Sequence, residues 1–145
     1  MQVKRLQPKG LNVRVVSGHV LYSHVVTVAG GTQVFIAGQL ARDADGNLVG
    51  RGDMRAQIEQ VGKNLQQCLV AAGARLDDLV KTTTYVTDIE EFFKHADIRM
   101  RYFGKALPTS TTVEVRRLSH PDFMVEVEAV AVIDDERTHA TSAHQ

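Results

Sequence analysis

Hydrophobic and polar residues alternate along residues 123–133, and this pattern predicts a β-strand. Successive side chains of a strand point to opposite faces of its sheet. One face of this segment is wholly apolar and consists of Val125, Val127, Ala129, Ala131 and Ile133. The other face begins with Glu126 and Glu128 and ends with Val130 and Val132. Carboxylates are seldom buried without partners, so we expect at least one glutamate at a rim, an interface or a cleft. An ordinary half-exposed sheet face is the alternative.

Five further segments have the β-branched or alternating character of strands. They are residues 13–16, 20–27, 33–37, 80–86 and 111–115. The turn signals Ser17-Gly18-His19 and Ala29-Gly30-Gly31 separate the first three segments. We therefore expect these three to pair as antiparallel hairpins.

Two segments have helical periodicity. In residues 53–72 the apolar positions recur at spacings of three and four, with Asp53 as the expected N-cap and Gly73 just beyond the C-terminus. Cys68 falls on this apolar stripe, and we interpret it as a small core residue rather than a nucleophile. A capping box over residues 87–90 opens a second helix, which we expect to end before Leu107-Pro108. Its apolar face comprises Phe93, Ala96, Met100 and Phe103.

This order of elements predicts an α+β fold, with a single sheet and two helices on one face. The remaining apolar face of the sheet would then meet another chain, so we expect an oligomer. We assign residues 1–133 to one domain and residues 134–145, which are polar and without periodicity, to a flexible C-terminal tail.

Composition and charge exclude several classes of function. Lys plus Arg and Asp plus Glu both number 17, so no basic field favours nucleic acid. Asp43-Ala44-Asp45-Gly46-Asn47 resembles the start of a calcium loop but lacks the spaced glutamate, and we expect a plain turn. No histidine spacing supports a metal site. The single cysteine, and the lack of a signal-like or membrane-length apolar run, predict a cytoplasmic protein that does not enter a membrane.

An ordered series of short motifs resembles the RidA family, also called YjgF/YER057c/UK114. The series spans roughly residues 20–133 and reads Tyr22-Ser23-His24, Phe35-Ile36-Ala37-Gly38-Gln39, Gly52-Asp53, Asn64, Ala71-Ala72-Gly73, Asp78-Leu79-Val80-Lys81, Tyr85-Val86-Thr87-Asp88, Phe92, Pro108, Val113-Glu114-Val115, Leu118 and Val125-Glu126-Val127-Glu128-Ala129. The resemblance implies a chorismate-mutase-like α+β fold and a homotrimer with small-molecule clefts between subunits. It also implies a cytoplasmic location and, for active members, hydrolysis of enamines or imines to 2-oxo acids and ammonia. That activity needs neither a metal nor an organic cofactor.

The resemblance also implies roles for individual residues. Tyr22 matches the family's cleft tyrosine, and the backbone of Gly38 matches a glycine that helps bind the ligand's carboxylate or carbonyl group. Glu126 matches the glutamate that positions the hydrolytic water. Thr112 lies where many members have cysteine, and Ser110 lies where active members have an arginine that binds the substrate carboxylate.

The serine at position 110 is the main departure from the family pattern. A hydroxyl offers one neutral donor, whereas a guanidinium offers a charged fork. The loss is worth about 1.5 to 3 kcal/mol of binding free energy, or about tenfold to a hundredfold in affinity. Arg116 has the strand parity of Ser110 but lies six residues away, roughly 20 Å along a strand. We therefore expect little of the standard activity on 2-imino acids.

Three classes of function remain. The first is a cofactor-free hydrolase or deaminase that acts on an imine, enamine or amide, with Glu126 as the base. Burial in a partly dry cleft would raise the pKa of this carboxyl group towards a useful range. The second is a trimer that binds a metabolite without turnover. The third is a ribonuclease or translation inhibitor, as some family members have been labelled, which the balanced charge disfavours.

Overall fold

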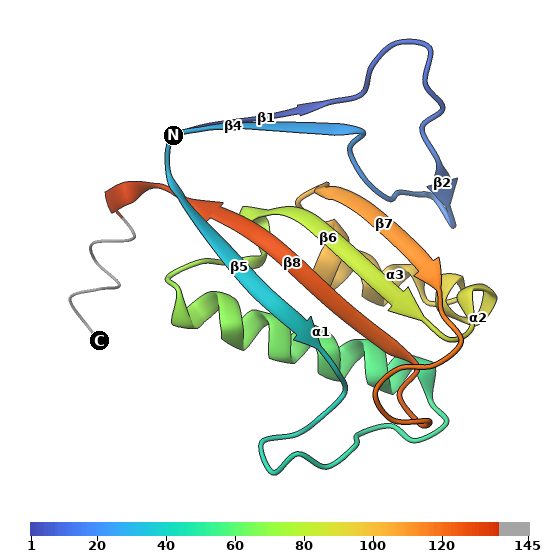
Figure 1. The fold of residues 1–145 in the computed structure, drawn as a ribbon. Helices are drawn as coiled ribbons and strands as arrows, with labels where there is room; N and C mark the ends of the chain where they lie inside the picture. The colour runs from blue at the N-terminus through green and yellow to red at the C-terminus, as the bar shows by residue number, and fades with distance from the viewer. Residues whose placement is uncertain (137–145) are drawn as a thin grey trace.

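A four-stranded sheet forms the centre of the computed structural model, which describes residues 1–136. Its strand order is β5 (Thr32–Gln39), β8 (Val125–Ile133), β6 (Leu79–Val86) and β7 (Thr109–Glu114). The strand β8 runs antiparallel to both of its neighbours, while β6 and β7 are parallel (Figure 1). A parallel pair requires a crossover, and the short helices between β6 and β7 provide it.

The long helix α1 (Met54–Ala71) crosses one face of this sheet (Figure 1). Asp53 caps it, because an Oδ1 atom of Asp53 accepts a hydrogen bond from the backbone N–H of Ala56 at 3.1 Å. Gly73, with φ of +78°, follows the end of the helix. Its buried stripe consists of Met54, Gln57, Ile58, Val61, Gly62, Leu65 and Leu69. Both expected helix limits are confirmed, and Cys68 packs against the core as predicted.

The second helical region is segmented rather than continuous. It comprises α2 (Ile89–Phe93), α3 (Ala96–Arg99) and a π-helical turn, η2 (Met100–Gly104), while a 3₁₀ turn, η1 (Leu76–Asp78), precedes β6. The N-cap is Asp88 rather than Thr87, and its Oδ1 atom accepts from the N–H of Glu91 at 3.0 Å. The aspartate carboxylate takes the role that we expected of the threonine.

The N-terminal strands form two small sheets outside the central one. The strands β2 (Val15–Val16) and β3 (His19–Val20) form the expected tight hairpin. The strands β1 (Gln2–Leu6) and β4 (Val25–Ala29) form an antiparallel ribbon that runs past the end of the central sheet where β8 ends and β6 and β7 begin (Figure 1). The prediction of a hairpin between β4 and β5 was wrong. The backbone of β4 is paired to β1, and β5 takes β8 as its neighbour, because Gly30 and Gly31 turn the chain out of one sheet and into the other.

The two faces of the central sheet differ as the alternation along β8 predicts. The apolar side chains of β8 face α1 and are buried. On the other face, which we call the outer face, Phe35 has 74% of its surface exposed. Val132 is also on this face but is only 4% exposed, and Val26 and Val28 of the ribbon lie close to it, around a shared pocket with Val130. The α+β class, with helices on one face of the central sheet, is confirmed.

Gln57 of α1 lies in the core and forms side-chain hydrogen bonds to the backbone of three residues outside the helix. Its side-chain amide donates to the carbonyl oxygens of Gly50, at 3.0 Å, and Asp122, at 2.9 Å. Its Oε1 atom accepts from the N–H of Met124 at 2.8 Å. A fully buried amide whose donors and acceptor are all used holds the start of β8 against α1.

The sequence also predicted a turn at Asp43 and a C-terminal tail. The segment at Asp43 is a turn as predicted, in which Asp43 Oδ1 accepts from the N–H groups of Asp45 and Asn47. Most of the expected tail, residues 137–145, lies outside the described residues. The domain boundary at residue 133 stays a prediction.

Candidate functional site

Glu126 and Gly38 meet on the outer face of the sheet. A Cβ atom added to Gly38 would lie 2.9 Å from Cδ of Glu126 and closer still to Oε1. The carboxylate of Glu126 therefore lies over the backbone of β5, in the space that a side chain at position 38 would need. Burial, with a contribution from the charge of Glu128, raises the pKa of Glu126 above its usual range. Such a shift moves a carboxyl group towards use as a general base near neutral pH.

Glu128 lies one step further along the same face and is held differently. Its Oε1 atom accepts a hydrogen bond from the hydroxyl of Tyr85 at 3.0 Å. The same bond raises the pKa of Tyr85, because the carboxylate stabilises the protonated phenol. Within residues 1–136 the carboxylate of Glu126 has no hydrogen-bond partner of this kind and only approaches Gly38 closely, so the two glutamates are not equivalent.

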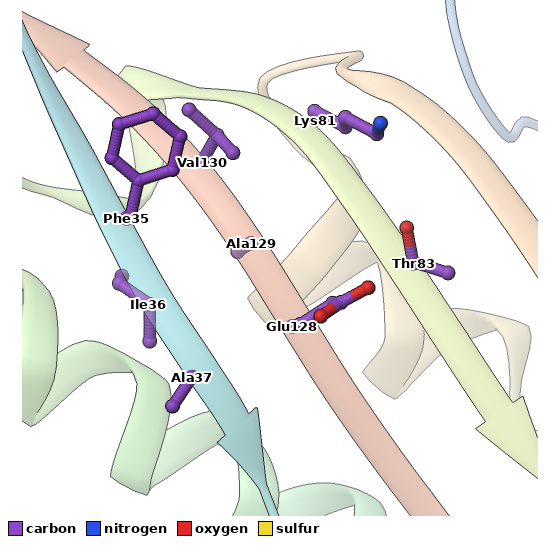
Figure 2. Close-up of a pocket in the computed structure, with 8 residues that line it drawn as sticks. All are labelled: Phe35, Ile36, Ala37, Lys81, Thr83, Glu128, Ala129 and Val130. Carbon is purple, nitrogen blue, oxygen red and sulfur yellow. The ribbon is translucent and has the colours of Figure 1, made fainter.

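A hollow of about 330 Å³ adjoins Glu128 on the outer face. Its lining comes from three adjacent strands and consists of Phe35, Ile36, Ala37, Lys81, Thr83, Glu128, Ala129 and Val130 (Figure 2). Lys81 and Glu128 place opposite charges on its wall, while Phe35 and Val130 make its other end apolar. This mixture suits a small molecule that has both a polar and an apolar part.

Ser110 and Thr112 are on the opposite face of the sheet from Glu126. On β6, Tyr85 pairs with Glu126, whereas Thr84 pairs with Thr112. Adjacent residues of a strand point to opposite faces, so Thr112 and Glu126 project in opposite directions. Ser110, two residues before Thr112, shares its face. One copy of the chain therefore cannot bring all the expected site residues to one cleft.

Arg99 approaches Ser110 from the helical layer. Its Nη2 atom donates a hydrogen bond to the Oγ atom of Ser110 at 3.3 Å, and the whole residue is only 5% exposed. Burial, together with the nearby charge of Arg14, lowers the pKa of Arg99 to about 10. Arg99 was not expected from the sequence because it stands on a helix, eleven residues before Ser110. An arginine at an otherwise buried position of that helix was the available signal.

Tyr22 lies in the loop between β3 and β4, apart from Glu126. The adjacent Ser23 donates from its hydroxyl to the carbonyl of Leu107 at 2.7 Å and from its N–H to that of Pro108 at 3.1 Å. These bonds hold the loop near the start of β7. The ring of Tyr22 makes an edge contact with that of His24, with 5.3 Å between centroids. The expected site residues thus occupy three places: Glu126 with Gly38, Ser110 with Thr112, and Tyr22.

In residues 1–136, no three His, Cys, Asp or Glu side chains gather where they could hold a metal ion. No helix in this part of the chain has both the length and the apolar character needed to cross a membrane.

The chain is similar to known proteins over most of its length. The family model for endoribonuclease L-PSP matches residues 15–133. A RutC family protein of Pyrococcus abyssi is 37% identical over 110 residues, which cover 76% of this chain and 84% of that protein. A 2-iminobutanoate/2-iminopropanoate deaminase of Mus musculus is 32% identical over 111 residues, which cover 77% and 80%.

Solved structures agree with these matches. YyfB of Yersinia pestis, described as a protein of unknown function of the conserved Rid protein family, superposes with a TM-score of 0.79. It is 32% identical, and the match covers 92% of this chain and all of that one. The motifs, the family model and the shared fold lead to one conclusion: the chain belongs to the RidA (YjgF/YER057c/UK114) family, whose model carries the description endoribonuclease L-PSP.

Proposed function

We propose that the protein is a cofactor-free hydrolase of the deaminase type, which acts on a small imine, enamine or amide in a cleft between two subunits of a homotrimer. The observation that supports this best is the carboxylate of Glu126, held over Gly38 with a raised pKa. The name of the mouse relative, a 2-iminobutanoate/2-iminopropanoate deaminase, adds support from a family member. Location in the cytoplasm remains part of this proposal.

The proposed reaction on an imine needs one base and one water molecule. Glu126 accepts a proton from the water as the water oxygen bonds to the imine carbon. The proton then passes to the nitrogen, which has taken up the π electron pair of the carbon–nitrogen bond, and a carbinolamine results. Glu126 next moves the hydroxyl proton of this intermediate to the nitrogen, the carbon–nitrogen bond breaks, and ammonia leaves. The carbon is left as a carbonyl group. A carboxylate with a raised pKa is a stronger base than an ordinary one, so it suits the removal of a proton from water.

The distribution of the site residues supports a cleft between copies. Glu126 and Gly38 are on the outer face, and Ser110 and Thr112 are on the helical face of the same sheet. A site that contains both groups takes one group from each of two copies. The exposed Phe35 and the hollow beside Glu128 make the outer face suitable for contact with a second copy.

Replacement of Glu126 by glutamine tests the proposal. The variant Glu126→Gln keeps the size of the side chain but removes the base, so turnover should fall by roughly 10² to 10⁴ while ligand binding changes little. Ligands are first found by thermal shift over small oxo acids, amides, lactams and pyrimidine-derived intermediates, and ammonia release is then measured. Glu90→Gln, at an exposed position on α2, is the control and should keep full turnover. Equal ammonia release from wild type and Glu126→Gln would remove Glu126 from the chemistry.

Binding without turnover is the second candidate function. The neutral Ser110 at the position of the family's arginine favours it, because β7 offers no charge there to orient a substrate. A wild-type protein that binds several of these ligands and releases ammonia from none of them would establish this function instead.

A further inference from the structure

The guanidinium of Arg99 is buried without a carboxylate partner. Only 5% of the residue is exposed, and no aspartate or glutamate within residues 1–136 forms an ion pair with it. Its Nη2 atom donates to Ser110, but its Nη1 atom has no hydrogen-bond partner in this part of the chain. A buried charge with an unused donor is costly unless an anion pairs with it.

The surroundings of Arg99 add positive charge and apolar surface. Its Cζ atom lies 5.4 Å from the ring centroid of Phe92 and 5.8 Å from that of Phe93. The Cζ atom of Arg14, in the exposed loop before β2, lies 4.5 Å from the centroid of Phe93. Aromatic faces attract a cation but offer no acceptor in the plane of the guanidinium. Two arginines lie near the same ring, and neither forms an ion pair with an acid within residues 1–136, so an anion is favoured beside them.

Thr112 provides a second, independent observation. Its hydroxyl is buried and has no hydrogen-bond partner among the described residues. It shares the helical face of β7 with Ser110, two residues away, so the two hydroxyls and the Arg99 guanidinium belong to one corner between β7 and α3. Orphaned buried polar atoms from both a strand and a helix indicate a polar group that reaches this corner.

We propose that Arg99, assisted by Arg14, Ser110 and Thr112, binds the carboxylate of the small-molecule ligand. This inference rests on the proposed function, for which it names the residue that orients the substrate: a guanidinium on α3 that pairs with a carboxylate of the ligand. The guanidinium is supplied from α3 instead of β7, and Ser110 leaves the space that an arginine side chain on β7 would fill. The proposal also replaces the expectation of little activity on 2-imino acids, because that expectation considered only arginines on strands.

Calorimetric titration with two matched probes tests the inference on the intact wild-type protein. The probes are 2-oxobutanoate, which is the product expected from 2-iminobutanoate, and its neutral amide. If the corner binds a carboxylate, the acid should bind at least about tenfold more tightly than the amide. Inorganic phosphate is the comparison anion. Equal affinity for acid and amide, no binding of the acid, or tighter binding of phosphate would each overturn the proposal.

Variants then locate the binding. Arg99→Gln should weaken 2-oxobutanoate by about tenfold to a hundredfold and leave the amide unchanged. Arg99→Lys keeps the charge but loses the fork, so its affinity should be intermediate, and it remains informative if the glutamine variant does not fold. Arg101→Gln is the matched control, because Arg101 is exposed and stacks on Tyr102. Binding of the acid by Arg99→Lys and Arg99→Gln at wild-type strength would overturn the assignment.

The two proposals fail separately. Binding of 2-oxobutanoate that depends on Arg99, without ammonia release from any imine, would leave the anion site standing and remove the hydrolase. Ammonia release that depends on Glu126, with acid binding unaffected by Arg99, would leave the hydrolase standing and remove the anion site.

Discussion

The carboxylate of Glu126 lies directly over the Cα atom of Gly38, so that the missing side chain on β5 makes the room for the acid on β8. Gly38 has no left-handed backbone angle, unlike eight other glycines of the chain. Its small size, rather than conformational freedom, is therefore what the structure uses. A glycine next to the proposed base lets the two strands pair while the carboxylate remains on the outer face.

The variant Gly38→Ala should move the carboxylate of Glu126 with little effect on the stability of the fold. The added methyl group meets the far end of a flexible side chain, so the carboxylate can rotate away, and unfolding by denaturant should show only a small loss of stability. Turnover should fall at least about tenfold, because the base is displaced from its water. The double variant Gly38→Ala/Glu126→Gln should be no slower than Glu126→Gln alone. Full turnover by Gly38→Ala would show that the contact does not position the base.

The raised pKa of Glu126 predicts how stability depends on pH. In the folded state this carboxyl group holds its proton at a higher pH than in the unfolded state. The folded state then binds more protons than the unfolded state between the two pKa values, so the free energy of unfolding falls as pH rises through that window. Above this pH window Glu126→Gln should melt at a higher temperature than wild type. Below the window the difference in melting temperature should be smaller. Thermal melts of both proteins from pH 4 to pH 8 measure the difference, and parallel curves would contradict the raised pKa.

Gln57→Leu should be strongly destabilising although it places an apolar residue in the core. The change removes the hydrogen-bond partners of Gly50, Asp122 and Met124, and each buried polar group left unpaired costs roughly 1–3 kcal/mol. We expect a loss of about 3 kcal/mol in the free energy of unfolding, measured in urea. Gln66→Leu, at an exposed position of the same helix, is the control and should change stability by less than about 0.5 kcal/mol.

Phe35→Glu tests whether the outer face meets another copy. Phe35 is 74% exposed in the single chain and lies beside Val130 at the hollow (Figure 2). A charge there would be buried without a partner in a trimer, so light scattering should show a loss of trimer mass. Val70→Glu is the control: Val70 is 67% exposed, but it stands on α1, on the other side of the sheet, and its variant should stay trimeric. A wild-type monomer at micromolar concentration would contradict the predicted assembly.

Much of the fold could be predicted from residues close together in the chain. The limits of α1 follow from Asp53, from Gly73 and from the spacing of apolar residues between them, and all three act within a few turns of one helix. The alternation along β8 likewise predicts which of its residues enter the core. The motifs also predicted Glu126 and Gly38 as site residues, and the structure places the two in contact, while their role stays a prediction.

Other features depend on contacts between segments that are distant in the sequence, and such features could not be predicted from the sequence. Whether β4 pairs with β5 or with β1 depends on which edge is free after the whole sheet has assembled, and Gln2–Leu6 has no strong strand pattern of its own. The placement of Ser110 and Glu126 on opposite faces depends on the registers of β6 with both β7 and β8. Arg99 reaches Ser110 because α3 packs under β7. The sequence by itself therefore determined the helix α1, the two-faced strand β8 and the family, because local periodicity and motif order specify them. Only the tertiary structure decided the neighbours of β4, the placement of the candidate site residues on two faces and the cation beside Ser110, because strand register and helix packing are set by burial summed over the whole chain.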